Sequence, residues 1–410
     1  MQEPKEKQDP IDIQYELAKK KILDKIVNKS VLCSKSTVNF TTRTLEALMS
    51  MDKKKLIELS ENGLPDDLPE MRSLIWKINF EYLPLDPQKW GAVLVSKRAS
   101  YKNYRNFVFE KLEKELKLLE NYDNLSAVDK KNLDKTTHKM VLEEICKDIN
   151  RTHTEMNFFV KPIDKKNMFS EKELIKLVET KRNCTLKSLN ATYKINIVLT
   201  HADVLSRILF IYSKFEPEVS YVQGMNEIIA PIYYIFSFDK TYGVEPSIEN
   251  IEADTFWAFN SLMAQLKDTF NREKDIEDVG VSGKVKRLKL MLKLIDFQLF
   301  EHFENYKLEF STFAYRWFIL FFSQDFLMID ILRLWDYIFA PDDKFQNCYF
   351  ISLAILLLKR DELLISDMTG MLANLKAIKG LNVEDIITIS KKIKTNYGKE
   401  CLEIINKEYE

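Results

Sequence analysis

Apolar residues recur at helical spacing over most of the chain. In the segment 201–215 the apolar positions lie three or four residues apart and form one stripe along a helix. No run of useful length alternates apolar and polar residues, as a half-buried strand does. The pattern therefore predicts an all-α fold. Further predicted helices cover residues 44–60, 98–120, 140–151, 253–269, 284–304, 312–322, 328–339, 348–359 and 383–407, and another begins at Pro69.

The composition agrees with this prediction. Only 9 Gly and 11 Pro occur in 410 residues, which favours long helices over a sheet-rich fold. The chain is 46% apolar and long enough to bury a large core, so we expect two lobes. Its 61 basic and 62 acidic residues leave a net charge of -1, which gives no general electrostatic reason to bind nucleic acid.

Cysteine and histidine usage bears on the compartment and on metal binding. The five cysteines are scattered and never form a CxxC pair, which indicates a reducing compartment without a disulfide framework. The four histidines have no metal-ligand spacing, so we expect no metal site.

The N-terminus lacks the apolar core of a signal peptide, and the apolar run 349–358 is too short to span a bilayer. We expect a soluble cytoplasmic protein.

A polar break predicts the domain organisation. The break covers 237–254 and separates a predicted N-terminal lobe, 44–240, from a predicted C-terminal helical lobe, 250–410. Residues 1–43 are interpreted as a tail and a leading helix. Two stretches, near 112–140 and near 161–190, are largely polar and interrupt the periodicity, so we expect two surface insertions there.

The stretch 217–236 combines polar side chains with the start of an apolar helix. Tyr221, Gln223, Asn226 and Glu227 are costly to bury without partners. Gly is scarce in this chain, so Gly224 suggests a backbone that comes close to another group. Either these residues form an internal network or they face a ligand. The pattern alone favours the internal network.

A second segment, 145–151, places a cation at a helix end. Asp148 and Arg151 lie at i and i+3 on a helix, and such a pair on a surface contributes only about 0.2–0.5 kcal/mol. The pattern ends just after Arg151, however, and an arginine braced by a carboxylate one turn back can project a rigid planar cation. Without further motifs, a structural ion pair is the simpler interpretation.

The most basic window, 284–293, has apolar residues on one face of its predicted helix. A basic amphipathic helix can lie on an anionic membrane, but a core helix with a solvated basic face is the favoured interpretation. The nearby glycines at 280 and 283 lack the spacing and the preceding strand of a phosphate-binding loop.

Three short motifs in order resemble the TBC family, whose members are GTPase-activating proteins for Rab GTPases. The likeness extends from about residue 45 to the C-terminus. The first motif has an Arg four residues before a Trp, the second reads Ile-x-x-Asp-x-x-Arg, and the third reads Tyr-x-Gln. In this chain the matching residues are Arg72 and Trp76, then Ile145, Asp148 and Arg151, then Tyr221 and Gln223.

The resemblance implies a two-lobed helical TBC domain and roles for these residues. Arg151 resembles an arginine finger and Gln223 a glutamine finger, both supplied in trans to GTP on the partner. Asp148 would orient Arg151. Arg72 and Trp76 would be structural. Tyr221, Gly224, Asn226 and Glu227 would shape the loop that carries Gln223.

The resemblance also implies the partner. This would be a Rab-family small GTPase in its GTP-bound state, which itself binds the Mg-GTP, so the chain needs no cofactor and is an activator rather than an enzyme with its own substrate. Membrane contact would be peripheral at most and made through the Rab. The alternatives are a catalytically silent Rab-binding scaffold, which would not require the two fingers, and a plain helical interaction domain with accidental motif matches.

Overall fold

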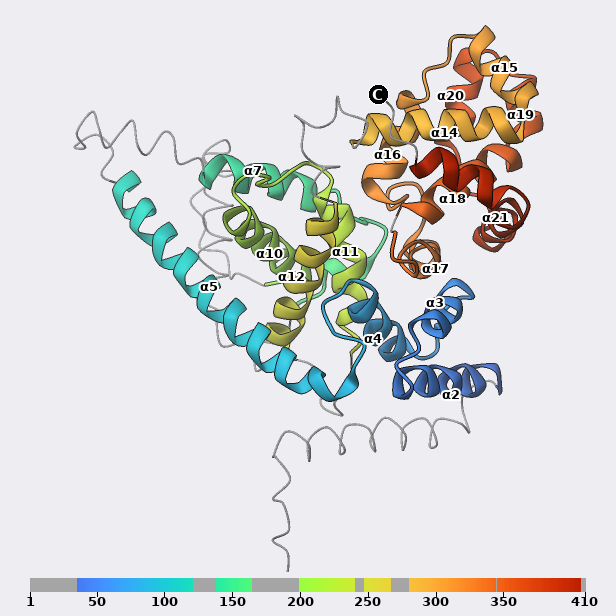
Figure 1. Cartoon of the computed structure of the whole chain (residues 1–410). Helices are drawn as coiled ribbons and strands as arrows, with labels where there is room; N and C mark the ends of the chain where they lie inside the picture. The colour runs from blue at the N-terminus through green and yellow to red at the C-terminus, as the bar shows by residue number, and fades with distance from the viewer. Residues whose placement is uncertain are drawn as a thin grey trace, which may run out of the picture. The chain divides into compact units, whose positions relative to one another are not determined.

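The computed structural model of the chain describes residues 35–120, 138–163, 199–239, 247–266, 280–343 and 345–406 (Figure 1). Within these ranges the regular structure is helical, and Pro162 and Thr200 form an isolated β-bridge. The predicted all-α fold is therefore confirmed for the described residues. Among them, no helix has both the length and the apolar character needed to cross a bilayer.

The two predicted insertions lie mostly outside the described residues. This applies to 121–137 in the first insertion and to 164–190 in the second. The start of the first, 112–120, is described and continues helix α5. The predicted tail up to residue 34 is also outside the described residues.

The described chain divides into two compact units that are not consecutive in sequence. One contains residues of Tyr82–Ser261, and the other contains Ser36–Glu81 together with Leu262–Glu410. The predicted lobes, 44–240 and 250–410, were consecutive segments, so this division differs from them at 44–81 and at 250–261. Long-range bonds contribute to both differences, because Arg72 is paired with Asp336 and Glu252 is paired with Arg207.

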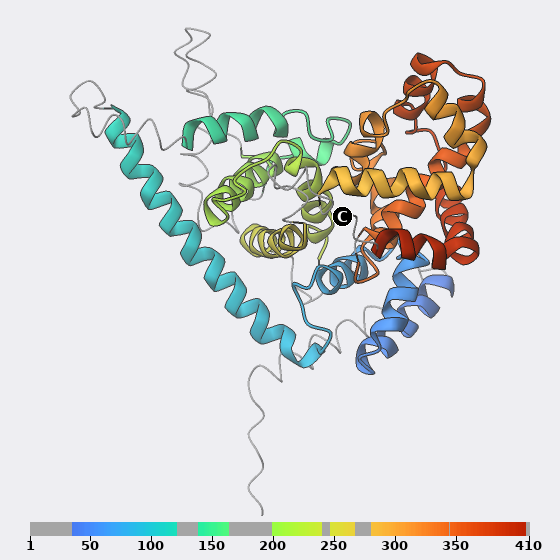
Figure 2. The ribbon, with the colours of Figure 1, turned by 45° about the horizontal axis from the view of Figure 1, so that its top comes forward.

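In the first unit, α10 is the central helix. Figures 1 and 2 both show α7 and α12 on either side of it. The start and end of α10 agree with the predicted segment 201–215, and its N-terminus has a capping box between Thr200 and Asp203. The helices of this unit are α5 (Trp90–Glu120), α7 (His138–Ile149), α8 (Asn157–Val160), α10 (His201–Phe215), α11 (Met225–Phe236) and α12 (Ile248–Gln265), with the 3-10 helix η1 (Pro87–Lys89).

A buried carboxylate joins three of these helices. Glu252 of α12 is fully buried and accepts a bond of 2.7 Å from Nε of Arg207 in α10. It also accepts a bond of 2.5 Å from the hydroxyl of Tyr101 in α5. Burial and the neighbouring Glu252 carboxylate raise the pKa of Tyr101, so its hydroxyl stays protonated and continues to donate.

The first residue of α10 lies in an aromatic environment. His201 Nδ1 is 2.7 Å from the hydroxyl oxygen of Tyr233, and the ring of Phe158 stacks on the imidazole with centroids 4.4 Å apart. Burial, and to a lesser extent the charge of Lys161, lower the pKa of His201 to about 4. The folded protein therefore keeps this histidine neutral over most of the working pH range.

The lowered pKa predicts that stability falls with acid. The ordinary pKa of His201 is 6.5, so between about pH 6.5 and pH 4 the unfolded chain binds a proton that the folded chain does not. Stability present above this range is lost as pH falls through it, by at most about 3 kcal/mol for a partly exposed group. Urea unfolding at pH 7 and pH 5 measures this loss. His201→Phe should show a smaller difference between the two pH values, and an unchanged difference would contradict the assignment.

In the second unit, α14 packs against four other helices: α15, α16, α18 and α21. The longest, α21, also lies along α18 and contacts α17. The helices of this unit are α2 (Lys35–Met49), α3 (Lys53–Glu61), α4 (Pro69–Asn79), α14 (Val281–Ile295), α15 (Phe297–Asn305), α16 (Ser311–Leu320), α17 (Met328–Ile338), α18 (Gln346–Leu358), α19 (Arg360–Leu364), α20 (Met368–Lys376) and α21 (Val383–Asn406).

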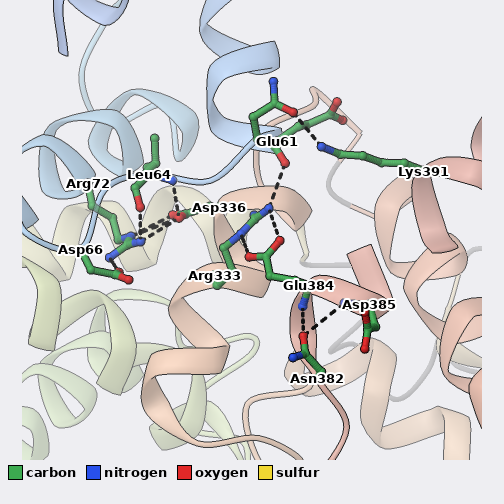
Figure 3. A network of polar contacts seen from close by, with 11 residues as sticks. Glu61, Leu64, Asp66, Arg72, Arg333, Asp336, Asn382, Glu384, Asp385 and Lys391 are labelled. Atoms are coloured by element: carbon green, nitrogen blue, oxygen red, sulfur yellow. Dashed lines mark hydrogen bonds and ion pairs between the residues drawn. The ribbon is translucent and has the colours of Figure 1, made fainter. Parts of the chain in front are cut away.

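A buried polar network, seen in Figure 3, joins α4 to α17 in this unit. Asp336 is fully buried and pairs with Arg72, whose Nη2 lies 3.0 Å from Oδ2. The indole of Trp76 donates to Asp336 Oδ1 at 2.8 Å, and the backbone N–H of Leu64 donates to Oδ2 at 3.1 Å. Burial alone would lower the pKa of Arg72, but Asp336 raises it above its usual value, so the guanidinium stays charged. The first sequence motif thus fixes α4 to α17.

A glycine in a left-handed conformation follows the end of α3. The helix stops at Glu61, and Gly63 adopts φ +97°, in the left-handed region that favours glycine. A Cβ at this position would lie 2.8 Å from Nε of Arg333, so any other residue would require the Arg333 side chain to shift as well as a strained backbone. The predicted segment 44–60 thus ends one residue before the last residue of α3.

Two predicted helices are interrupted in the structure, and some short helices were missed. The segment 44–60 contains the end of α2 and most of α3, and the segment 284–304 is divided at Asp296. Asp296 leaves the helical conformation with φ -141°, and its side chain accepts from the N–H of Leu299 at 3.0 Å, which starts α15. The helices α8, α19 and α20 were not predicted because each is short.

Candidate functional site

The second and third motifs lie together in the first unit. Helix α7 ends at Ile149, and Arg151 follows in the turn. Nη2 of Arg151 is hydrogen-bonded to Oδ1 of Asp148, so the predicted i, i+3 pair is present. The Arg151 side chain is 65% exposed, whereas that of Asp148 is 4% exposed. A buried carboxylate therefore holds a guanidinium that reaches into solvent.

Tyr221 of the third motif binds the other oxygen of the Asp148 carboxylate. Tyr221 donates a hydrogen bond of 2.7 Å from its hydroxyl to Oδ2 of Asp148. Burial, and then this bond to Asp148, raise the pKa of Tyr221 far above its ordinary value, so the hydroxyl remains a donor at any working pH. Each oxygen of Asp148 thus has one side-chain partner, and Arg151 is positioned by a residue that is itself fixed.

Asn226 joins the start of α11 to the turn after α7. Its side-chain nitrogen lies 2.9 Å from Oγ1 of Thr152 and 2.9 Å from Oε1 of Glu227. Thr152 in turn donates to the backbone carbonyl of Asp148 at 3.0 Å. These side chains are buried, and a buried network whose groups are paired is rigid.

Gln223 lies in the turn directly before α11. Its side chain is exposed, and the helix begins two residues later at Met225. Gly224, between them, adopts φ +99°, a left-handed conformation that glycine accepts without strain. The sequence predicted that the backbone comes close to another group at Gly224. The structure shows that the chain turns sharply at this residue. The turn presents the Gln223 amide just outside the buried network.

From the sequence, these polar residues could either form an internal network or face a ligand. In the structure, some of them form the network and the others are exposed. Tyr221, Asn226 and Glu227 are buried in the network with Asp148. Gln223 and the side chain of Arg151 are exposed, one on each of the two linked turns. The exposed groups are the ones available to a partner.

Two residues of this network were not found from the sequence. Thr152 carries the link between Asn226 and the turn, and only its place directly after Arg151 could have indicated it. His153 is buried with φ +40°, and its Nε2 lies 3.7 Å from a carboxylate oxygen of Glu227. Its other ring nitrogen is 3.3 Å from a carboxylate oxygen of Glu155. No spacing rule in the sequence indicated this position.

Arg72 and Trp76 do not join this network. They belong to the second unit and bond to Asp336, as described above. Their predicted supporting role is therefore a contribution to the core of that unit.

The two exposed side chains can bind and orient a ligand through hydrogen bonds. A guanidinium offers a planar set of N–H donors that matches phosphate oxygens and stays charged. The exposed amide of Gln223 offers both a donor and an acceptor. Among the described residues, no three His, Cys, Asp or Glu side chains come together as metal ligands do. The absence of a cofactor stays a prediction.

Comparison with known proteins finds similar chains. The model of the family described as the Rab-GTPase-TBC domain matches residues 189–364. TBC1 domain family member 13 of Homo sapiens is 30% identical over 382 residues, which cover 84% of this chain and 94% of that protein. GTPase-activating protein GYP1 of Saccharomyces cerevisiae is 30% identical over 36% of this chain and 25% of that protein. The crystal structure of the Ypt/Rab-GAP domain of Gyp1p, at 19% identity, has a TM-score of 0.60 and covers 96% of this chain and 100% of that chain, which shows a shared fold.

Proposed function

The chain belongs to the TBC domain family of Rab GTPase-activating proteins, and we propose that it accelerates GTP hydrolysis by a GTP-bound Rab by supplying Arg151 and Gln223 in trans. The observation that carries this proposal is the exposed guanidinium of Arg151, which the carboxylate of Asp148 holds in position. Arg151 is 65% exposed and is held by a buried carboxylate that Tyr221 also fixes. The GTP and its magnesium ion would be bound by the Rab.

Arg151 would stabilise charge that develops during phosphoryl transfer. Negative charge spreads over the phosphate oxygens in the transition state, and catalysis consists mostly of positioning and electrostatic stabilisation. A guanidinium placed in advance loses little conformational freedom when it meets the phosphate. The pair with Asp148 provides this placement.

Gln223 would orient the attacking water. An amide can accept a hydrogen bond from water through its oxygen and donate one through its nitrogen, so it can hold a water molecule in line with the γ-phosphate. The turn at Gly224 presents this side chain to solvent, and Asn226 ties the same segment to the turn that carries Arg151. One network would thus place both groups.

Removal of the Tyr221 hydroxyl should weaken the positioning of Arg151 without removing it. Tyr221→Phe deletes the bond to Asp148 but keeps the buried ring, and a hydrogen bond to a charged group contributes about 1.5–3 kcal/mol. We expect the maximal rate of GTP hydrolysis under single-turnover conditions to fall about tenfold or more, with little change in affinity for the GTP-bound Rab. Tyr397→Phe, a variant of an exposed tyrosine, is the matched control. An unchanged rate would show that the hydroxyl does not position the finger.

The second candidate is a scaffold of the same fold that binds a Rab without accelerating hydrolysis. Both exposed groups count against it, since binding alone does not require a guanidinium and an amide on one network. A panel of GTP-loaded Rab proteins separates the two candidates when phosphate release and binding are measured on the same samples. Acceleration of one or a few Rab proteins supports the proposed function. Binding of a GTP-loaded Rab without acceleration supports the scaffold.

A further inference from the structure

The exposed face of α14 has an unusual mixture of side chains for a surface helix. Its inner face is buried, as the sequence predicted, and includes Val285, Leu288 and Leu292. The outer face of a helix in a water-soluble protein is normally polar. Here Leu290 is 37% exposed and Leu294 is 43% exposed, and both lie on the outer side.

Lysines alternate with these leucines along the same face. Lys286, Leu290, Lys293 and Leu294 are exposed on this side of α14, and Phe297, the first residue of α15 after the break at Asp296, is 56% exposed. We call these five residues the α14 outer face. They belong to one unit and lie on α14 and at the start of the next helix, α15, so their grouping does not depend on how the two units are placed.

We propose that the α14 outer face binds directly to the surface of an anionic lipid bilayer. Single exposed apolar residues are common and need no explanation, but Leu290, Leu294 and Phe297 are all exposed within one short stretch that also carries two exposed lysines. An anionic bilayer offers both matching features, because its headgroups attract lysine and its interfacial region accepts leucine and phenylalanine. Lysine can lay its aliphatic chain along apolar surface while its ammonium group stays at the headgroups.

The alternation favours a bilayer over an acidic protein segment. An acidic segment would pair with the lysines and would leave the leucines and Phe297 without a reason to be exposed. The patch also has a defined end, since Glu301 is exposed one turn after Phe297. Lys289 pairs with Glu304 of α15 at 2.8 Å and is not counted in the patch.

This inference is independent of the proposed GTPase activation and goes beyond the expectation of membrane contact made only through a Rab. It concerns a surface of the second unit, whereas Arg151 and Gln223 belong to the first. A variant of the α14 outer face should therefore keep its activity toward a GTP-loaded Rab in solution.

Vesicle sedimentation of the full chain tests the proposal. The probes are vesicles of phosphatidylcholine alone and of phosphatidylcholine mixed with phosphatidylserine. We expect binding to the mixed vesicles, weakened by salt, and at most weak binding to the neutral ones. Lys286→Glu/Lys293→Glu should lower the partition coefficient at least about tenfold, since each lysine near an anionic surface contributes roughly a fivefold increase. Leu294→Ser/Phe297→Ser should lower it as well.

The control replaces two other exposed lysines, Lys392→Glu/Lys399→Glu on α21, and should bind as the wild type does. Thermal unfolding of each variant shows whether its fold is retained. The proposal is overturned if the wild type does not bind the mixed vesicles, or if the control loses as much binding as the α14 variant. It is also overturned if only the lysine variant loses binding, because the surface would then recognise charge alone, as an acidic protein partner would present it.

Discussion

Arg151→Ala is expected to reduce the acceleration of GTP hydrolysis by about 10³–10⁵-fold while the fold and the affinity for the GTP-bound Rab are largely kept. This corresponds to a barrier about 4–7 kcal/mol higher. The reason is that the exposed guanidinium would act on charge that exists only in the transition state, so its removal should lower the rate of the chemical step more than it lowers binding. Single-turnover phosphate release with saturating activator measures the effect.

Two further variants make this result specific. Arg151→Lys keeps the charge but loses the planar set of donors, so we expect it to recover only a small part of the activity. Lys147→Ala removes a different exposed cation from the same helix, α7, and should behave as the wild type does. If Arg151→Ala were as active as Lys147→Ala, Arg151 would not be a finger.

The largest expected effect on stability comes from Asp336→Ala in the second unit. Removal of this fully buried carboxylate leaves the charge of Arg72 without its main partner and the N–H groups of Trp76 and Leu64 without their acceptor. Loss of one partner from a buried ion pair costs about 3–5 kcal/mol. Urea unfolding, monitored by circular dichroism, should show a correspondingly lower midpoint, or no folded second unit at all.

A surface pair provides the matched control for this prediction. Asp342 pairs with Lys53, and both side chains are more than half exposed, so Asp342→Ala should cost less than about 1 kcal/mol. The double variant Arg72→Met/Asp336→Leu removes both buried charges and should be more stable than Asp336→Ala. Equal costs for Asp336→Ala and Asp342→Ala would contradict the structural role of the first motif.

The candidate site could be located from the sequence because its signals are local. The pair of Asp148 and Arg151 follows from helical spacing, and the end of α7 follows from the loss of periodicity after it. Gly224 next to polar residues indicated a special backbone position, although the prediction was a close approach to another group rather than the turn that the structure shows. By themselves these local features favoured a structural ion pair and an internal network. The resemblance of the three motifs to the TBC family is what singled out Arg151 and Gln223, and their roles stay proposals.

The remaining features depend on contacts between distant parts of the chain. Arg72 and Asp336 are 264 positions apart, and no pattern near either residue identifies the other. The grouping of 36–81 with the C-terminal half depends on such contacts, which explains why consecutive lobes were predicted. The hydrogen bond from Asn226 to Thr152 joins residues 74 positions apart, so no local pattern in the sequence predicts it either. The break at Asp296 is different, because an aspartate before a helical segment is a common N-cap and could have been recognised.

The measurement that tests the central claim most directly is single-turnover GTP hydrolysis by the Rab that the panel identifies. Wild type, Arg151→Ala and Gln223→Ala are compared at saturating concentrations, and the affinity of each for the GTP-bound Rab is measured in parallel. The proposed mechanism predicts that the wild type accelerates hydrolysis and that each variant binds with similar affinity but loses most of the acceleration. Tight binding by the wild type without acceleration, or full activity in both variants, would contradict it.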